Sequence, residues 1–332
     1  MKPRHVLWSV IGGTSALAAG APLLAQTFTV NSVTTSKPSF GNIAAAASGT
    51  TDFRITPAGV VSVVSGNGGN TPSGTKGAAT VTIRCTGSST CASATALVKI
   101  WTDTTVSGRA QAVKNLTVAS GTGTVGSVTT NGDGSIQFPL TGFSGTSSRT
   151  FTLGLDLPIK GDTASTSTSA AARWRVGVAK SPMVPASSST QTNAIATVRK
   201  AMTLTKTSDL AFGAIRAPDS GSSVVTINQT TGARTLTSGT ALLLGGLTTG
   251  RAQFTVGGQA SRSFTMSVPT SLTLMRAGGG SLTSTLTATA TGTQTLNASG
   301  AFSLGVGGAL TVPSGTAGGN YSGTFTVTVS YN

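Results

Sequence analysis

Short segments in which apolar and polar residues alternate run along most of the chain, and turns rich in Gly and Ser separate them. Examples are VSVVS, ATVTIRC, ALVKIW, RTFTLGLDL, RWRVGVA, RSFTMSV and TFTVTVSY. Because successive side chains of a strand point to opposite faces, a period of two predicts β-strands, whereas apolar residues at helical spacing are nearly missing. Many short strands with frequent turns are typical of an all-β sandwich or barrel.

The end of the sequence shows the same alternation in its clearest form. Residues Phe325, Val327, Val329 and Tyr331 are spaced two apart, with Thr and Ser between them. This spacing places the four apolar side chains on one face of a strand. We therefore expect the sequence to finish inside a sheet.

The first 25 residues have the layout of a secretory signal peptide. Lys2 and Arg4 precede an apolar stretch, and a small-residue region ending APLLA follows it. Cleavage is expected after Ala25, with Ala18 as the alternative. No later segment approaches the roughly 18 apolar residues that a membrane helix needs. The mature protein is expected to be exported, secreted through the periplasm, and not integral to a membrane.

The acidic residues argue against catalysis. All seven are Asp, Glu is absent, and the one His lies in the predicted signal peptide. General acid–base chemistry and metal binding both use His, Glu and paired Asp side chains. We therefore predict no enzymatic activity, no catalytic or metal-ligating residues, and no cofactor.

The balance of charges is strongly basic. The region after residue 25 has 20 Lys and Arg against seven Asp, a net charge of +13. These cations are dispersed, with Arg199-Lys200 as the adjacent pair, and aromatic residues make up 5% of the sequence. Nucleic-acid binding requires clustered cations and stacking aromatics. We expect a general attraction to acidic surfaces and no specific nucleic-acid partner.

Cys85 and Cys91 are the two cysteines of the chain. They flank a Gly/Ser turn between two segments with strand alternation. In an oxidising compartment such a pair predicts a structural disulfide across a loop.

The length suggests two domains. One sandwich of about 300 residues would be oversized, and the segment Ser181–Asn193 has two prolines and a run of small polar residues. We expect an N-terminal sandwich over residues 26–180, a linker over 181–193 and a C-terminal sandwich over 194–332.

An internal repeat supports this division. FGNI, starting with Phe40-Gly41, returns as FGAI, starting with Phe212-Gly213. FTLGLDLPI from Phe151 matches FSLGVGGALTVP from Phe302, and a final alternating strand follows each block. Each Phe-Gly pair is expected to combine a core side chain with a turn that needs glycine.

Three segments carry a resemblance to a known family: SDLAFGAI from Ser208, FSLGVGGALTVP from Phe302 and GGNYSGTFTVTVSYN from Gly318. Together they resemble an exported bacterial pilin-like family of unknown function, similar to the spore coat protein U domains of archaic chaperone-usher pili. The resemblance covers most of Lys200–Asn332 and is thinner over residues 26–180.

The resemblance implies immunoglobulin-like sandwiches, with one strand missing from the C-terminal one. The open groove would accept a strand first from a periplasmic chaperone and then, at the usher, from the neighbouring pilin subunit. Phe325, Val327, Val329 and Tyr331 would line this groove, and the carboxylate of Asn332 would be offered to the chaperone.

The position in a fibre follows from the N-terminal segment. Thr27–Val33 is expected to pair within its own domain, which leaves no donor strand and makes the chain a tip adhesin with residues 26–180 as the contact domain. The loops Ser65–Gly77 and Ala119–Ser135 are candidate contact surfaces, and the surface that they contact is expected to be acidic or apolar. The alternatives are a two-domain stalk subunit that donates Thr27–Val33, and a secreted matrix or surface-layer protein that assembles without a chaperone.

Overall fold

The computed structural model describes residues 26–34, 37–66, 68–71, 74–86, 91–188 and 190–332. The predicted signal peptide lies outside these residues. All the regular elements of the described residues are β-strands, which form several sheets packed as sandwich-like folds. The predicted all-β class is confirmed. Nowhere in this part of the chain is there a helix long and apolar enough to cross a membrane.

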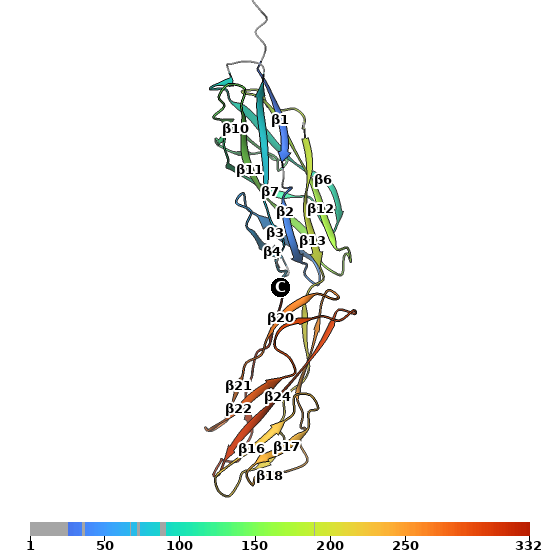
Figure 1. The fold of residues 1–332 in the computed structure, drawn as a ribbon, viewed down its shortest axis with the longest axis vertical. Helices are drawn as coiled ribbons and strands as arrows, with labels where there is room; N and C mark the ends of the chain where they lie inside the picture. The colour runs from blue at the N-terminus through green and yellow to red at the C-terminus, as the bar shows by residue number, and fades with distance from the viewer. Residues whose placement is uncertain (1–25, 35–36, 67, 72–73, 87–90, 189) are drawn as a thin grey trace, which may run out of the picture.

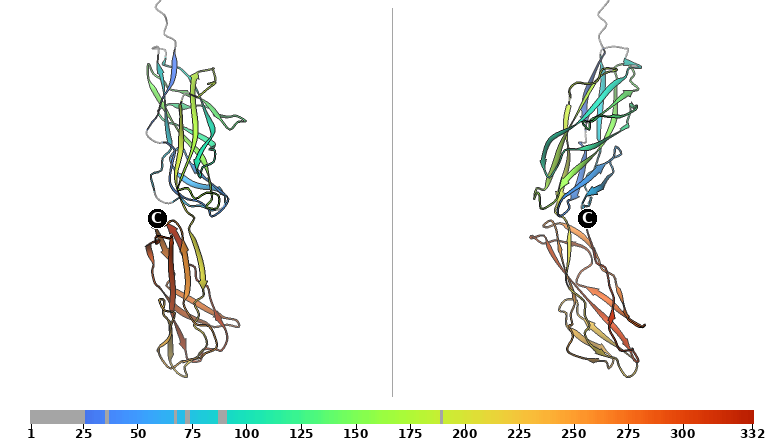
Figure 2. Two further views of the ribbon diagram at one scale, coloured as in Figure 1. Left: turned by 90° about the vertical axis from the view of Figure 1, so that its right-hand side faces the viewer. Right: turned by 180° about the vertical axis from the view of Figure 1, so that it is seen from behind.

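The strands fall into two groups, which we call the N-terminal half (residues 26–199) and the C-terminal half (residues 203–332). Figures 1 and 2 show the two halves stacked end to end, with the C-terminus at the junction between them. Most of the buried apolar residues form separate clusters in the two halves. Ala44, at the end of the second strand, is buried in the cluster of the C-terminal half.

The N-terminal half is a sandwich of two sheets. One sheet has the order β1-β5-β11-β3-β4, with β7 on β11, and the other has the order β2-β13-β12-β6-β10-β8, with β9 on β10. The strands are β1 (Thr27–Thr34), β2 (Ser39–Ala44), β3 (Thr50–Ile55), β4 (Val61–Gly66), β5 (Ala79–Thr86), β6 (Ala96–Gly108), β7 (Lys114–Ser120), β8 (Thr124–Val125), β9 (Thr129–Thr130), β10 (Ile136–Thr141), β11 (Ser148–Lys160), β12 (Ser169–Lys180) and β13 (Thr190–Arg199).

The C-terminal half contains one large sheet and two small ones. The large sheet has the order β14-β19-β24-β22-β21-β25, with β16 between β24 and β17, and the small sheets are β23-β20-β26 and β15-β18. The strands are β14 (Thr203–Ser208), β15 (Ile215–Arg216), β16 (Ser222–Ile227), β17 (Arg234–Ser238), β18 (Leu242–Leu243), β19 (Ala252–Gly257), β20 (Ser263–Ser267), β21 (Ser271–Arg276), β22 (Ser281–Ala288), β23 (Gly292–Thr295), β24 (Ala301–Pro313), β25 (Tyr321–Ser322) and β26 (Thr328–Tyr331).

Aromatic side chains fill the core of the N-terminal half. Phe40, Phe138, Phe151 and Trp174 are fully buried, and the rings of Phe138 and Phe151 meet edge to face at 5.0 Å. These residues occupy the inward positions of their strands, as the alternation predicts. The buried ring of Trp174 is therefore part of the core and is not a surface platform.

The predicted disulfide is confirmed. Cys85, in β5, is bonded to Cys91, and both side chains are buried in the core of the N-terminal half. The bond closes a short loop and is structural, because it leaves no free thiol among the two cysteines of the chain.

The predicted linker needs a correction. Residues 190–199, partly assigned above to the linker and partly to the second domain, form β13, which pairs with β12 over Thr190–Thr197 and with β2. The inward side chains of β13 are Ala194, Ala196 and Val198, all buried. The chain therefore leaves the N-terminal half after Arg199 and begins β14 at Thr203.

The first strand pairs within its own half, as predicted. β1 runs antiparallel to β5, with Phe28 opposite Cys85 and a register shift between Val30 and Ser32. This irregularity explains why Phe28, Val30 and Val33 do not follow a strict period of two, yet all three pack on the core.

Asp103 holds two arginines on the outer face of the β6–β12 ladder. Its carboxylate lies 3.0 Å from Nε of Arg173 and 3.0 Å from Nε of Arg175, and it accepts a hydrogen bond from the backbone N–H of Thr105 at 2.8 Å. Burial acts to raise the pKa of Asp103, but the hydrogen bonds from Thr105 and Arg173 outweigh burial and lower the pKa to about 2.

We expect this cluster to make the N-terminal half sensitive to acid. Because the pKa of Asp103 is lower in the folded chain than its ordinary value of 3.8, the stabilisation is present above about pH 4 and is lost as the pH falls through about 2. Unfolding midpoints measured from pH 5 to about pH 2 should fall less steeply for Asp103→Asn than for the unmodified chain. Equal slopes would contradict this assignment.

Candidate functional site

The ladders of the two halves match in register. In the N-terminal half, Ala170 and Val178 of β12 pair with Gly108 and Val98 of β6. In the C-terminal half, Tyr321 of β25 and Val329 of β26 pair with Arg276 of β21 and Met266 of β20. In both cases a step of eight residues on one side of the ladder corresponds to a step of ten residues on the other side. By this register, Trp174 corresponds to Phe325 and Ser169–Val176 corresponds to Asn320–Val327.

The Phe-Gly segments also correspond. Ser39, before Phe40, bridges to Gly77, and Ala211, before Phe212, bridges to Gly250 in the same antiparallel sense. β2 therefore has its counterpart in the segment around Phe212 and β15. The repeat seen in the sequence is thus a repeat of backbone pairing.

The strand β13 of the N-terminal half has no counterpart in the C-terminal half. β13 lies between β12 and β2, antiparallel to Ser169–Val176 and parallel to β2. Within residues 203–332, which the structure describes without a gap, β25 pairs with β21 alone and β26 pairs with β20 alone. Gly323–Val327, between them, belongs to no strand. The edge of Asn320–Val327 that corresponds to the β13 side of β12 therefore has no strand partner.

A cleft of about 1000 Å³ opens where this partner would lie. One wall is the segment from Asp209 to Ala217, and the opposite wall is the segment from Thr316 to Phe325. These walls are the counterparts of β2 and of the start of β12. The cleft thus occupies in the C-terminal half the place that β13 fills in the N-terminal half.

Core side chains form the floor of the cleft. They come from three strands of the large sheet and from the Phe212 segment, and they are Leu272, Leu274, Leu282, Leu310, Val312 and Phe212. Most are also members of the buried apolar clusters of this half. Apolar surface that meets solvent through an open cleft is unfavourable, so the cleft favours a partner that covers it.

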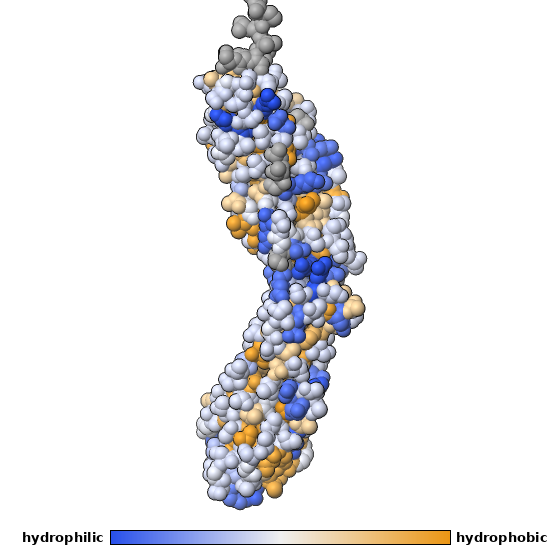
Figure 3. Space-filling model, in the orientation of Figure 1, coloured by the Kyte–Doolittle hydropathy of each residue, from blue (hydrophilic) through white to orange (hydrophobic). Residues whose placement is uncertain are grey.

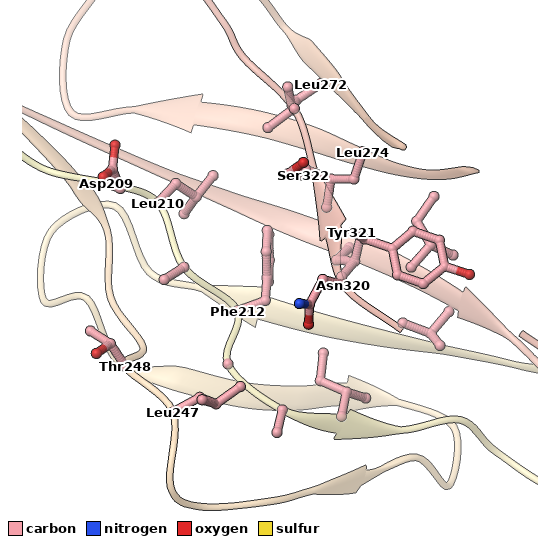
Figure 4. A pocket seen from close by; sticks show the side chains of 18 of the residues that line it. Asp209, Leu210, Phe212, Leu247, Thr248, Leu272, Leu274, Asn320, Tyr321 and Ser322 are labelled. Carbon is pink, nitrogen blue, oxygen red and sulfur yellow. The ribbon is translucent and has the colours of Figure 1, made fainter. Parts of the chain in front are cut away.

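The walls carry different groups, as Figure 4 shows. Leu210 and Phe212 point into the cleft from one side, and Asn320, Tyr321 and Ser322 lie on the other. The Tyr321 hydroxyl donates a hydrogen bond to the carbonyl of Ala317 at 2.9 Å. This bond connects two residues of the same wall. The sequence alone did not point to these wall residues, because segments about a hundred residues apart form the two sides.

The structure places the predicted groove residues in two locations. Phe325 lines the cleft, and its ring meets that of Phe254 edge to face at 6.2 Å. Val327 and Tyr331 are buried, 8% and 6% exposed, and Val329 packs on the same cluster. Of the four apolar residues expected along the groove, Phe325 lines this cleft, whereas Val327, Val329 and Tyr331 are not among its lining residues and pack in the core cluster of this half.

Tyr331 lies at the junction of the two halves. Its hydroxyl donates to the carbonyl of Lys200 at 2.9 Å and accepts from the backbone N–H of Gln259 at 2.6 Å. The next residue, Ala201, donates its N–H to Asp162 of the N-terminal half at 2.8 Å. Burial raises the pKa of the Tyr331 phenol, so the hydroxyl keeps its proton at neutral pH.

Asn332 also lies at this junction and not on the cleft. Its side-chain carbonyl accepts a hydrogen bond from the Thr265 hydroxyl at 2.5 Å, and its backbone oxygen lies 3.5 Å from Nη1 of Arg199. The predicted carboxylate contact with a chaperone would have to compete with this arginine.

The predicted contact loops do not lie together. Asn70 and Gly77, in the loop Ser65–Gly77, bridge to Ala44 and Ser39 of β2, beside the junction. The segment Ala119–Ser135 contains β8 and β9, which pair with β10. The first loop therefore lies away from the free pole of the N-terminal half.

The described residues contain no group of three or more His, Cys, Asp or Glu side chains that could hold a metal ion. Hydrophobic residues instead gather at the far end of the C-terminal half (Figure 3), where Figure 1 places β18. Leu242, Leu244 and Leu247 in this region are exposed.

Comparisons with known proteins give limited matches. None of the curated proteins matches the chain. A structure described as a bacterial adhesin from Mobiluncus mulieris, containing intramolecular disulfide, isopeptide and ester bond cross-links, aligns over 67% of this chain and 86% of its own, with 10% identity and a TM-score of 0.13. Residues 202–331, which include both walls of the cleft, match the family described as Domain of unknown function (DUF4402).

Proposed function

We propose that the chain is a structural and adhesive subunit of an extracellular pilus, which is assembled when its C-terminal half accepts a β-strand from another protein. One observation carries this proposal. The N-terminal half fills the space between β12 and β2 with its own β13, whereas the equivalent space of the C-terminal half is an open apolar cleft.

The chemistry of the cleft fits a strand better than a small molecule. Gly323–Val327 and the segment around Phe212 both lack a ladder partner on the cleft side. A strand laid between them would pair with backbone groups of both walls and cover the leucines of the floor. Its source is a periplasmic chaperone before assembly at the usher and the neighbouring subunit in the fibre.

The pairing of β1 supports a position at the tip. Because β1 is already held by β5 and its Phe28 is buried, it is not free to complete another subunit. The N-terminal half, closed by its disulfide and by β13, then acts as the contact domain, and the basic surface favours acidic targets. The stalk alternative requires β1 to leave this ladder.

This proposal implies secretion through the periplasm, no enzymatic activity and no cofactor. The rival is a matrix or surface-layer protein that assembles without a chaperone. The two differ in how the purified mature chain responds to a chaperone or a strand peptide. A strand acceptor with an open cleft should self-associate as its concentration rises.

We expect the purified chain, residues 26–332, to form oligomers that dissociate when a chaperone or a strand peptide covers the cleft. Sedimentation velocity over a concentration series measures this directly. A chain that stays monomeric and binds neither a pilus chaperone nor a strand peptide would contradict the proposal.

A further inference from the structure

The Phe212 wall of the cleft is held from behind by one arginine. Nη1 of Arg234, at the start of β17, donates to the carbonyls of Phe212 at 3.0 Å and Ala214 at 3.1 Å. Nη2 of the same side chain donates to the carbonyl of Leu244 at 2.8 Å. Arg234 does not line the cleft itself. It therefore ties the wall to the hairpin behind it without occupying the binding space.

Gly213 makes this contact possible. Its φ of +72° lies in the left-handed region, and a Cβ at this position would stand 2.7 Å from Nη1 of Arg234 and 2.5 Å from Cγ2 of Thr249. Any larger residue would displace the guanidinium group. The glycine of the Phe-Gly pair thus has a second role here, which is to leave room for an arginine.

The wall needs such a support because a strand is missing on its other side. In the N-terminal half, the equivalent strand β2 is held by the ladder with β13, in which Thr197 lies opposite Asn42. In the C-terminal half, residues 212–214 belong to no strand, and the cleft lies in front of them. Without a support, the apolar floor would favour inward movement of this wall to cover itself.

We propose that Arg234 is a positioning residue that holds the Phe212–Ala214 wall back, so that the cleft stays open and ready for an incoming strand. The planar guanidinium group suits this task, since its fork of N–H donors binds several carbonyls at fixed angles. This inference rests on the proposed strand uptake for its purpose, but its structural content can be tested without a strand.

The test uses the full mature chain and the dye bis-ANS, which reports apolar clefts. In Arg234→Gln and Gly213→Ala, the wall should move inward and the dye affinity should fall by about tenfold, the effect of losing hydrogen bonds from a charged donor. Arg234→Lys should lose less dye affinity than Arg234→Gln, because lysine keeps the charge and one donor group. The N-terminal unfolding transition should not change.

Two matched variants control for unrelated damage. Gly41→Ala places the same strain at the equivalent Phe-Gly pair, where φ is +65°, but touches no arginine. Arg251→Gln removes a guanidinium that bonds the carbonyls of Gln229 and Thr230, neither of which lines the cleft. Both should bind the dye as the unmodified chain does.

The outcomes separate the two proposals. Unchanged dye affinity in Arg234→Gln and Gly213→Ala, with the C-terminal transition intact, would overturn the role of Arg234. An equal fall in Gly41→Ala or Arg251→Gln would also overturn it. If Arg234→Gln fails to fold, Arg234→Lys and Gly213→Ala decide the question. Failure of a strand peptide to bind the unmodified chain would contradict the proposed function while leaving the dye result to stand.

Discussion

Removal of Thr324–Asn332 is expected to unfold the C-terminal half and leave the N-terminal half folded. The deletion takes away β26, which pairs with β20, and with it the buried side chains of Val327 and Tyr331 and the packing of Phe325. A large side chain contributes about 2–5 kcal/mol when it is buried, so the buried Val327 and Tyr331 together with the partly buried Phe325 approach the roughly 5–15 kcal/mol that holds a domain folded.

Calorimetry measures this effect, because the two halves have separate cores and should give separable transitions. The matched control is the triple variant Thr326→Ala, Thr328→Ala and Ser330→Ala, which changes three exposed residues of the same segment. It should keep both transitions. A truncated chain that retains the C-terminal transition would show that β26 does not belong to the core of this half.

An extra strand supplied in the same chain is expected to stabilise the C-terminal half strongly. The design copies residues 181–199 after Asn332, because in the N-terminal half this segment leads from the end of β12 into β13. Ala194 and Ala196 of the copy are replaced by Leu, since the cleft has a volume of about 1000 Å³ and an apolar floor. Burying two leucines contributes about 3 kcal/mol or more, which corresponds to a rise on the order of 10 °C in Tm.

The control for this design keeps its length and leucine content but moves the two leucines to the outward positions of Asn193 and Ile195. Because side chains alternate along a strand, these leucines would then point away from the floor. The control should give little stabilisation. Equal gains from both designs would mean that the added segment does not enter the cleft as a strand.

The alternation in the sequence was enough to predict the fold class and much of the strand content. The sequence predicted the disulfide, because Cys85 and Cys91 are separated by six positions, and it predicted that Thr27–Val33 pairs within its own half. It also placed Phe40 and Trp174 in the core. These are local signals, and tertiary context did not overturn them.

β13 was missed for a physical reason. Its inward residues are Ala194, Ala196 and Val198, and alanine gives a weak apolar signal compared with the leucines and phenylalanines of other strands. The nearby prolines Pro182 and Pro185 also suggested a linker. Small residues fit there because the strand packs beside β12 and β2, a condition that becomes visible only in three dimensions.

The C-terminal strand shows the opposite error. Alternation from Phe325 to Tyr331 predicted one continuous strand. In the structure the strand covers Thr328–Tyr331, and Gly323–Val327 forms no strand. A strand needs a hydrogen-bonding partner as well as a suitable sequence. The cleft could not be located from the sequence either, because its floor and walls come from segments that are distant in the sequence.

Hydrogen exchange of backbone amides tests the central claim most directly. The comparison is between the mature chain and the same chain with the added leucine strand, at the resolution of single amides. Strand uptake predicts slower exchange along both walls, at 211–216 and at 320–327, with little change in the N-terminal half. Unchanged exchange along both walls, in a chain whose added segment itself exchanges freely, would contradict the claim that this cleft receives a β-strand.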